Sequence, residues 1–442
     1  MTFLTYMEKK IIHSISCLLL KPTSILLFFF TLHFQACTTS NAISNEISKP
    51  TDNLVRTGIE VLKSKQFKML EGKKVGLITN ATGVDSKLTS TVDILFKAKN
   101  VQLTALYGPE HGVRGDHTAG EKVAQYNDEA TGLPVYSLYG KTRKPNKEML
   151  ANIDVLVYDI QDIGCRSYTF ISTMGKAMEA AAEFNKEFVV LDRPNPIGGN
   201  RVEGNIVEEG FESFVSPYKI PYLYGLTCGE LAHLLNDEGF LTNGVKCKLK
   251  VVTMQGWERD MSFEDTGLEW VPTSPHIPHK QSPFYYPATG IIGELYAISI
   301  GVGYTLPFQT FAAEWINPHS LAAKLNSFGL KGVNFRPLSF KPYYSSMKGK
   351  NLNGVQIHIT DFEAVNLSSL QFYFFQAHHA LYPEKNLFKL CDESRWSMFD
   401  KVCGTDKIRE SLMKEGSFEK IKWYWEKDVE TFTQLSKDYH LY

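Results

Sequence analysis

Two glutamate residues lie in surroundings that favour acid–base chemistry. Glu110 follows an apolar run and precedes a histidine and a glycine-containing segment, while Glu294 lies among isoleucine, leucine and tyrosine. Loss of water around a carboxyl group raises its pKa toward neutrality, which suits a general acid. Two carboxyl groups facing one sugar ring would supply the acid and the nucleophile or base of a glycosidase. A structural ion pair is the alternative for Glu294, because a buried carboxylate is costly unless it is paired or functional.

Three arginines lie in or beside polar motifs that follow apolar runs: Arg114, Arg166 and Arg193. A guanidinium group binds a carboxylate through two parallel hydrogen bonds, so an acidic sugar is a suitable ligand. Ion pairing with a neighbouring aspartate is the alternative for each arginine. We predict that one of the three binds a carboxylate of the ligand.

Signatures of other chemistries are missing from the sequence. No G-x-S-x-G motif marks a serine nucleophile, and no H-E-x-x-H motif marks a zinc site. The seven cysteines show no C-x-x-C spacing, and no G-x-G-x-x-G follows the first apolar strand-length run. We therefore expect neither a metal nor a dinucleotide cofactor.

The composition is that of a globular protein without a bias toward nucleic acid. The 442 residues are 43% hydrophobic and 21% charged, and 47 basic residues nearly balance 48 acidic ones. Such a chain can bury a sizeable core, and its net charge of −1 attracts no polyanion. The many aromatic residues suit the apolar faces of sugar rings, although aromatic residues fill protein cores as well.

The elements that must position these residues alternate between strand and helix patterns. Apolar runs of strand length lie at 74–79, 101–107, 154–160, 188–191 and 248–253, and helical spacing marks 89–99 and 173–185. Such alternation predicts an α/β fold with a parallel sheet covered by helices on both faces. Segment 270–287 contains five prolines and is predicted to be a long loop that shapes a cleft.

Polar motifs follow four of the predicted strands, at the carboxyl ends where ligands of open parallel sheets bind. The motifs are Thr79-Asn80, Pro109-Glu110-His111-Gly112, Asp159-Ile160-Gln161-Asp162 and Asp192-Arg193-Pro194-Asn195. Helix capping and turn formation are the alternative for each motif alone. Four such motifs at one edge predict a ligand site there.

The first 37 residues are typical of an export signal. An apolar run at 24–34 is too short to span a bilayer but suits the hydrophobic region of a signal peptide. The run ends at Phe34-Gln35-Ala36-Cys37, which resembles a lipobox, and a polar tether follows at 38–54. We expect lipidation of Cys37, export, and anchoring to a membrane in the periplasm or at the outer membrane. A plain secretory signal and a permanent transmembrane anchor are the alternatives.

Long motifs along the chain resemble the exo-β-N-acetylmuramidase family typified by NamZ. They include GLITNATGVD (76–85), YGPEHGVRG (107–115), VLDRPNPIGGNRVEG (190–204), YGLTCGELA (224–232) and FDKVCGTDKIRE (399–410). The resemblance implies a Rossmann-like domain, which we place at 55–250, a smaller C-terminal α/β domain at 251–442, and an active site between them. It also implies that the protein releases N-acetylmuramic acid from the non-reducing ends of peptidoglycan fragments or muropeptides.

The resemblance also implies roles for individual residues. Glu110 matches the glutamate of the family's E-H-G motif, and Glu294 matches the glutamate that precedes its glycine-rich segment, so both are candidate catalytic residues. We expect the substrate-binding residues among the polar side chains of the matching motifs. They are Asn80, His111, Arg114, Asp159, Gln161, Arg166, Tyr168, Asp192, Arg193, Asn195, His276 and Thr305.

One segment departs from the family pattern. The family commonly has E-G-T-N followed by S-x-G-R-G-T, whereas here Glu294 precedes Leu295-Tyr296-Ala297, and Val302 replaces the arginine. Loss of two polar side chains beside a candidate catalytic residue leaves the preferred substrate open. The alternatives to an exo-muramidase are a hydrolase that acts on another bond of muropeptides and a sugar-binding lipoprotein without catalysis.

Overall fold

A seven-stranded sheet forms the centre of the first half of the protein. The computed structural model describes residues 54–115 and 125–442, so Cys37, the signal peptide and nearly all of the tether lie outside the described residues. The strand order is β3-β4-β2-β1-β5-β6-β9, and neighbouring strands are parallel except β3 and β4. The strands are β1 (Lys74–Thr79), β2 (Gln102–Gly108), β3 (Tyr126–Asn127), β4 (Pro134–Ser137), β5 (Val155–Asp159), β6 (Glu187–Leu191) and β9 (Lys248–Val252).

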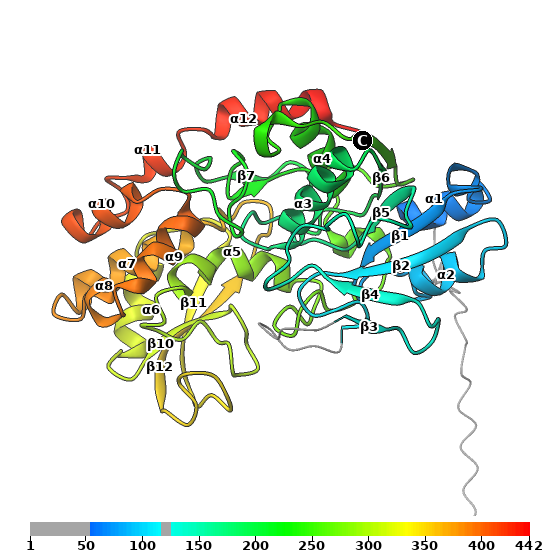
Figure 1. The fold of residues 1–442 in the computed structure, drawn as a ribbon. Coiled ribbons are helices and arrows are strands. Elements are labelled where there is room, and N and C mark those ends of the chain that lie inside the picture. The colour runs from blue at the N-terminus through cyan, green and yellow to red at the C-terminus, as the bar shows by residue number, and fades with distance from the viewer. Residues whose placement is uncertain (1–53, 116–124) are drawn as a thin grey trace, which may run out of the picture. The chain divides into compact units, whose positions relative to one another are not determined.

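Helices cover both faces of this sheet (Figure 1). Side chains alternate between the faces of a strand, and in β5 Val155 and Val157 belong to one hydrophobic cluster while Leu156 and Tyr158 belong to another. The first cluster includes side chains of α1 (Gly58–Ser64) and α2 (Thr91–Lys97), and the second includes those of α3 (Phe170–Glu183) and α4 (Cys228–Asp237). The predicted α/β fold, with a mostly parallel sheet between two helical layers, is confirmed.

A smaller antiparallel sheet, in the order β10-β12-β11, forms the second half. Its strands are β10 (Thr310–Ala313), β11 (Val333–Phe340) and β12 (Leu352–Ile359), and its neighbouring helices are α5 (Ser282–Gly293), α6 (Pro318–Asn326) and α7 (Leu370–Leu381). The chain then continues through α8 (Leu387–Leu390), α9 (Ser394–Cys403), α10 (Lys407–Glu415), α11 (Lys422–Trp425) and α12 (Val429–Ser436) (Figure 1). The short elements are β7 (Val202–Glu203), β8 (Leu223–Tyr224), and the 3-10 turns η1 (Lys68–Leu70), η2 (Thr242–Gly244), η3 (Phe263–Thr266) and η4 (Lys437–Tyr439).

The proline-rich segment 270–287 is a loop only as far as Gln281. Helix α5 begins at Ser282 because Pro283 lies in its first turn, where the backbone N–H that proline lacks has no partner within the helix. Pro287 lies inside the helix as well, and its carbonyl oxygen accepts a hydrogen bond from the Gln371 side chain. The prediction of a loop over the whole segment was therefore wrong at its end.

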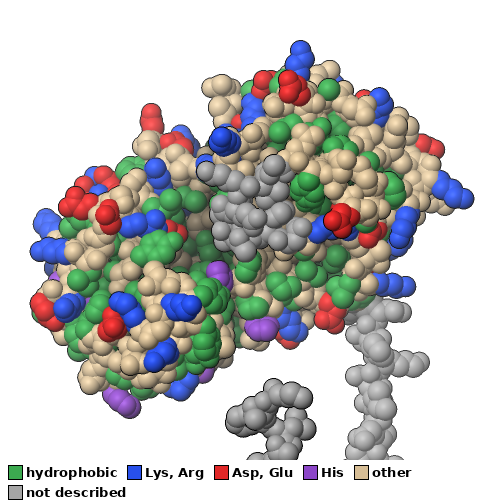
Figure 2. Space-filling view, turned by 60° about the horizontal axis from the view of Figure 1, so that its bottom comes forward, with side chains coloured by type: hydrophobic (Ala, Val, Ile, Leu, Met, Phe, Trp, Pro, Cys, Tyr) green, Lys and Arg blue, Asp and Glu red, His purple; other side chains and the backbone are tan. Residues whose placement is uncertain are grey.

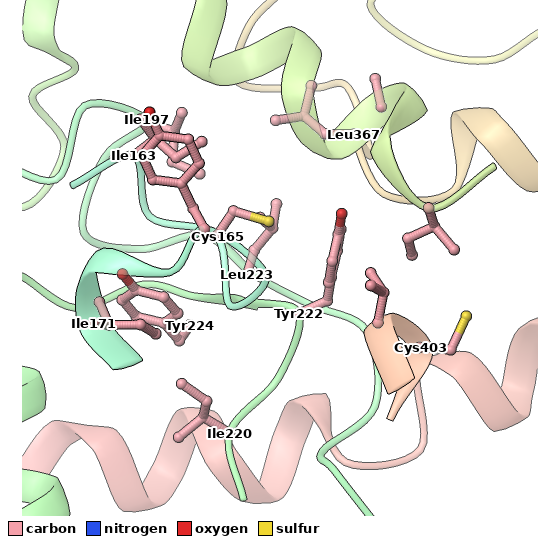
Figure 3. Close-up of a cluster of buried hydrophobic side chains, with 14 of the residues drawn as sticks. Ile163, Cys165, Ile171, Ile197, Ile220, Tyr222, Leu223, Tyr224, Leu367 and Cys403 are labelled. Atoms are coloured by element: carbon pink, nitrogen blue, oxygen red, sulfur yellow. The ribbon is translucent and has the colours of Figure 1, made fainter. Parts of the chain in front are cut away.

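Arg166 is buried at the junction of the two halves, in the segment between β5 and α3. Its guanidinium group donates to the carbonyl oxygens of Asn205 and Ile220 and to those of Val402 and Cys403 at the end of α9, at 2.6–3.0 Å. Figure 3 shows part of the buried hydrophobic cluster to which Tyr222 and Cys403 belong. Burial lowers the pKa of Arg166 only to about 10, so the group stays charged at neutral pH. The structure therefore gives Arg166 a structural role and does not place it where a ligand carboxylate could reach it.

Candidate active site

A cavity of about 530 Å³ lies between the first sheet and the helices of the second half. The lining residues come from the turn after β2, the loop after β4, the start of α3, segment 213–215, the loop before α5, α5 itself, the loop before β10, and α9. Figure 2 shows a face that is hollowed near its centre, where a histidine side chain lies. The described lining residues that carry the following argument are Glu110, His111, Tyr139, Arg143, Ser167, Tyr168, Ser213, Phe214, His276, Tyr286, Met398 and Lys401.

A tight turn presents Glu110 to this cavity. Strand β2 ends at Gly108, and the Gly112 N–H then donates to the Pro109 carbonyl oxygen at 3.1 Å. His111 has a φ angle of 74°, a conformation that costs a side-chain-bearing residue about 1 kcal/mol or more. A strained residue beside a carboxyl group at a strand end is a feature of functional sites.

Tyr139 is a hydrogen-bonding neighbour of Glu110. Burial, followed by the charge of Glu110 and a hydrogen bond to it, raises the pKa of the Tyr139 hydroxyl to about 12. Tyr139 therefore stays protonated at any physiological pH and donates to the carboxyl group. Among the described residues that line the cavity, Glu110 is the single carboxylate.

Two histidines and a tyrosine complete the polar lining. Burial and then the charge of the nearby His111 lower the pKa of His276, so the His276 ring is neutral near pH 7. Its Nε2 atom lies 3.0 Å from the Tyr344 hydroxyl, and the two rings are stacked. The Tyr168 hydroxyl shares a hydrogen bond of 2.7 Å with Thr273. Four of the predicted site residues thus line this one cavity: Glu110, His111, Tyr168 and His276.

The cations of the cavity are residues that sequence reasoning missed. Arg143 lies 4.3 Å from the centroid of the Phe214 ring, and Lys401 extends from α9. Neither has an ion pair with a carboxylate among the described residues. Arg143 lies in a basic loop and Lys401 in an ordinary helical pattern, so only the fold reveals their place. The available signals were two motifs of the family resemblance, TGLPVYSLYGKTRKP (131–145), which contains Arg143, and FDKVCGTDKIRE (399–410), which contains Lys401.

The arginines that we predicted as carboxylate ligands have partners of their own. Arg114 forms ion pairs with Asp128 at 2.9 Å and Asp93 at 3.3 Å. Arg193 binds both carboxylate oxygens of Asp159, at 2.5 and 3.0 Å. None of the three predicted residues, Arg114, Arg166 and Arg193, lines the cavity. The alternative of ion pairing therefore describes Arg114 and Arg193 better than ligand binding does.

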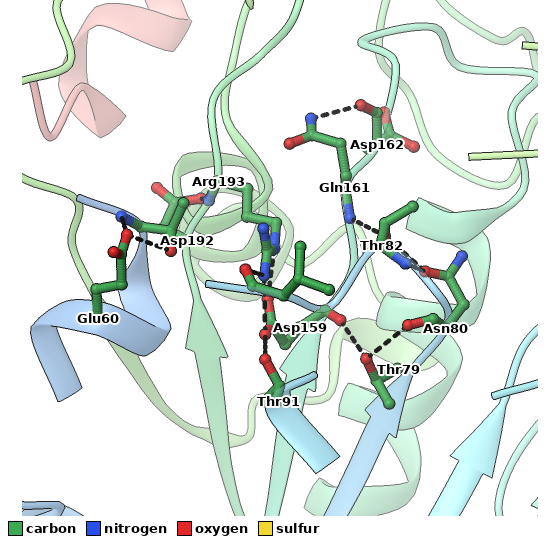
Figure 4. Close-up of polar contacts among 12 residues, drawn as sticks. Glu60, Thr79, Asn80, Thr82, Thr91, Asp159, Gln161, Asp162, Asp192 and Arg193 are labelled. Atoms are coloured by element: carbon green, nitrogen blue, oxygen red, sulfur yellow. Dashed lines mark hydrogen bonds and ion pairs between the residues drawn. The ribbon is translucent and has the colours of Figure 1, made fainter. Parts of the chain in front are cut away.

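The polar motifs at the sheet edge do meet, as predicted, but they bind one another (Figure 4). Thr91 donates to Asp159 at 2.5 Å, and Asn80 accepts two hydrogen bonds from Thr82. The Gln161 N–H donates to the Thr82 hydroxyl at 2.9 Å. The members outside the cavity are Asn80, Asp159, Gln161, Asp192, Arg193 and Asn195, and Thr305 lies exposed beyond it. Turn and capping chemistry accounts for these contacts. Of the four strand-end motifs, only the one after β2 supplies residues to the cavity, Glu110 and His111, and ligand binding by the other three stays a prediction.

Glu294 lies behind the cavity lining. Its carboxylate accepts a hydrogen bond of 2.6 Å from Arg395, whose guanidinium group also lies over the Tyr296 ring. Burial raises the pKa of Glu294, and Arg395 opposes this effect. The charge of Glu294 acts on Tyr286, which does line the cavity. In this structure Glu294 is therefore placed to act through its neighbours, and its role as the second catalytic carboxylate stays a prediction.

Two further properties concern the described residues as a whole. Residues 54–115 and 125–442 contain no cluster of three or more His, Cys, Asp or Glu side chains that could hold a metal ion. In the same part of the chain, no helix combines the length and the apolar character that a membrane crossing requires.

The fold and the cavity define a class of protein, one in which a parallel α/β sheet presents a carboxyl group to a cavity of sugar size. The chain belongs to the NamZ family: the description "exo-beta-N-acetylmuramidase NamZ, N-terminal" matches residues 75–281, and its C-terminal counterpart matches residues 284–442. These matches confirm the resemblance. The last strand of the large sheet, β9, ends at Val252, within the N-terminal match to residues 75–281.

Relatives of known identity agree with this assignment. The peptidoglycan β-N-acetylmuramidase NamZ of Bacillus subtilis (strain 168) is 47% identical over 393 residues, which cover 88% of this chain and 91% of that protein. Two crystal structures of DUF1343-family proteins from Bacteroides fragilis are similar as well. One is 60% identical with a TM-score of 0.85, the other 28% identical with a TM-score of 0.71, and each match covers 88% of this chain and 99% of that chain.

Two buried aspartates lie near this site without lining it. Asp162 accepts hydrogen bonds from Tyr224 at 2.5 Å and from the Gly164 N–H at 2.8 Å, while its other oxygen has no partner among the described residues. Burial raises the pKa of Asp162 to about 7 and that of Asp192 to about 6. These carboxyl groups take up protons in the folded state more readily than in the unfolded chain.

We expect Asp162 to make the protein less stable as the pH rises. The folded state retains a proton up to about pH 7, whereas the unfolded chain loses it near pH 4. The stabilising contribution is therefore full below about pH 4 and is lost as the pH rises through about 7. Asp162→Asn should flatten the dependence of Tm on pH in this window and raise Tm at pH 8. Thermal melts across this range measure both effects, with the exposed Asp260→Asn variant as the control. An unchanged slope in the Asp162 variant contradicts the assignment.

Proposed function

We propose that this protein is an exo-acting β-N-acetylmuramidase that releases N-acetylmuramic acid from the non-reducing ends of peptidoglycan fragments. The observation that carries the proposal is the presentation of Glu110 to a cavity of about 530 Å³, lined with aromatic and cationic groups, in a chain of the NamZ family. The cavity volume is within the range of small-molecule sites. No metal or organic cofactor enters the proposed reaction.

Glu110 serves as the general acid in this proposal. Hydrolysis of a glycosidic bond requires a proton on the leaving oxygen as its bond to C1 breaks and positive charge develops on the ring. A water molecule supplies the hydroxyl group that C1 retains, and its proton replaces the one that the acid has given up. Glu110 is the one carboxyl group among the described lining residues that can supply this proton, and the protonated Tyr139 hydroxyl donates a hydrogen bond that orients it. The neutral His276 ring and the Tyr168 hydroxyl supply further hydrogen bonds for the substituents of the sugar. Burial raises the pKa of the Tyr286 hydroxyl in the lining, and the charge of Glu294 raises it further. Arg395 donates a hydrogen bond to Glu294 and so fixes its position.

Lys401 is the proposed partner of the lactyl carboxylate that distinguishes muramic acid from glucosamine. That carboxylate belongs to the lactyl ether on C3, which C2 separates from the glycosidic bond at C1. Glu110, Tyr139 and the adjacent Arg143 mark the C1 side of the cavity, which leaves Lys401 on α9 for the C3 side. Lys401 has no carboxylate partner in the described part of the chain, so a substrate anion meets an unneutralised cation.

Replacement of Glu110 by glutamine should separate substrates according to their leaving groups. We expect a loss of about 10²- to 10⁴-fold on a natural disaccharide, whose poor leaving group needs the proton. A 4-nitrophenyl muramide needs little protonation and should be affected far less. Steady-state kinetics on both substrates measure the difference, and the exposed Glu129→Gln variant is the control. A uniform loss on both substrates would make Glu110 a nucleophile, base or binding residue instead.

Replacement of Lys401 should erase the preference for muramic acid over glucosamine. A hydrogen bond between charged groups contributes about 1.5–3 kcal/mol, so Lys401→Gln should lose roughly 10- to 150-fold in kcat/KM on an aryl muramide. Turnover of the matching N-acetylglucosaminide, which has no lactyl group, should change little. Lys401→Arg retains the charge and should recover part of the loss. Equal losses on both glycosides would place the carboxylate elsewhere.

A sugar-binding protein without catalysis is the second candidate. The observation that favours it is the ion pair between Glu294 and Arg395, which withdraws one of the two predicted carboxylates from the cavity. Turnover of any muramide by the wild-type protein excludes this candidate.

Export and lipid anchoring belong to the same proposal, because peptidoglycan lies outside the cytoplasmic membrane. Its support is the Phe34-Gln35-Ala36-Cys37 motif after an apolar run. We expect the protein to fractionate with membranes and to incorporate a labelled fatty acid, and Cys37→Ser to abolish the label. Cys17→Ser, upstream of the cleavage point, is the matched control. Labelling that persists in the Cys37 variant refutes the anchor.

A further inference from the structure

A second cavity, of about 590 Å³, adjoins the first. The two cavities share Arg143, Ser213 and Phe214, so the Arg143–Phe214 pair forms the boundary between them. Beyond this boundary the lining comes from α3, from the segment before β8 and from the turn after α4. The further lining residues that carry charge or an aromatic ring are Lys176, Glu212, Tyr218, Lys219, Glu238 and Phe240.

The second cavity lies on the leaving-group side of the proposed acid. A general acid must be next to the oxygen that departs, so the leaving sugar is on the same side as Glu110. Tyr139 donates to Glu110, and the charge of Arg143 reaches Tyr139. The path from Glu110 through Tyr139 to Arg143 therefore leads across the boundary into the second cavity.

The charges of this cavity are only partly neutralised. Lys176 is tied to Glu179 at 3.0 Å and to Thr242 at 3.1 Å. Glu212 accepts from the Gly210 N–H, and Glu238 accepts from the Tyr439 hydroxyl. Lys219 is exposed and has no ion-pair partner within the described residues, and the same holds for Arg143. Two cations thus remain available along the path that a leaving chain would follow.

We propose that the second cavity binds the leaving glycan strand, with Lys219 as the partner of the carboxylate on its next muramic acid residue. Muramic acid alternates with glucosamine in the glycan, so the sugar after the leaving glucosamine carries a lactyl carboxylate. The half-buried rings of Phe214 and Phe240 offer apolar faces to the sugars between. The inference rests on the proposed exo-muramidase activity and adds a preference for strands longer than a disaccharide.

The test compares substrates of two lengths. The wild-type protein should cleave a tetrasaccharide of alternating muramic acid and glucosamine about 10-fold better, in kcat/KM, than the disaccharide, because a charged hydrogen bond is gained. Lys219→Ala should lose this advantage and leave turnover of the disaccharide unchanged. Lys219→Arg should keep it, and Lys97→Ala, an exposed lysine on α2, is the matched control.

Each other outcome has a defined meaning. Equal rates on the two lengths, or a Lys219→Ala loss shared by both substrates, overturns the inference while the muramidase activity stands. A loss confined to a disaccharide that carries a stem peptide would assign the cavity to the peptide and also overturn it. Failure of the wild-type protein to cleave either substrate removes the proposed function itself, and the inference with it.

Discussion

The buried guanidinium group of Arg166 is the contact on which the site depends. It lies next to Ser167 and Tyr168, which line the first cavity, and it binds the carbonyl oxygens of Val402 and Cys403 at the end of α9. A cation at a helix C-terminus satisfies carbonyl groups that the helix leaves unpaired and opposes the negative end of its dipole. This one residue therefore holds α9, with Met398 and Lys401, against the start of α3.

Charge is divided between structure and function in a consistent way. At the edge of the large sheet, Asp159 and Arg193 neutralise each other and so fix the turns that follow β5 and β6. Two cations that face the cavity, Arg143 and Lys401, have no ion pair with a carboxylate in the described part of the chain. Desolvation makes an unpaired charge costly unless it is exposed or meets a ligand. An enzyme for an anionic sugar gains from placing cations where only the substrate neutralises them.

Much of the fold follows from local sequence patterns. The strands β1, β5 and β6 are buried on both faces, so they read as continuous apolar runs, and the helices between them keep a 3.6-residue period. Glu110 could be selected from its place after β2. Helix α5 could be read only in part, because proline is compatible with a first helical turn and the pattern does not reveal where the loop ends.

The site itself could be predicted less well than the fold. Polar side chains after strands look alike whether they cap a turn or bind a ligand, so Asn80 and Gln161 could not be separated from His111 by sequence. Lys401 reaches the cavity because of tertiary packing around Arg166, which no local pattern encodes. Arg166 is the opposite case, because its guanidinium group suggested that it binds a ligand. Its structural role is evident only from the structure, in which the buried guanidinium group makes five hydrogen bonds within the protein.

The central claim is that the protein removes muramic acid from non-reducing ends. The direct test is to incubate it with two synthetic disaccharides, one with N-acetylmuramic acid β-linked to N-acetylglucosamine and one with the order reversed, and to identify the products by mass spectrometry. The account predicts free N-acetylmuramic acid and N-acetylglucosamine from the first disaccharide and no product from the second. Cleavage of both disaccharides, of the second alone or of neither would contradict it.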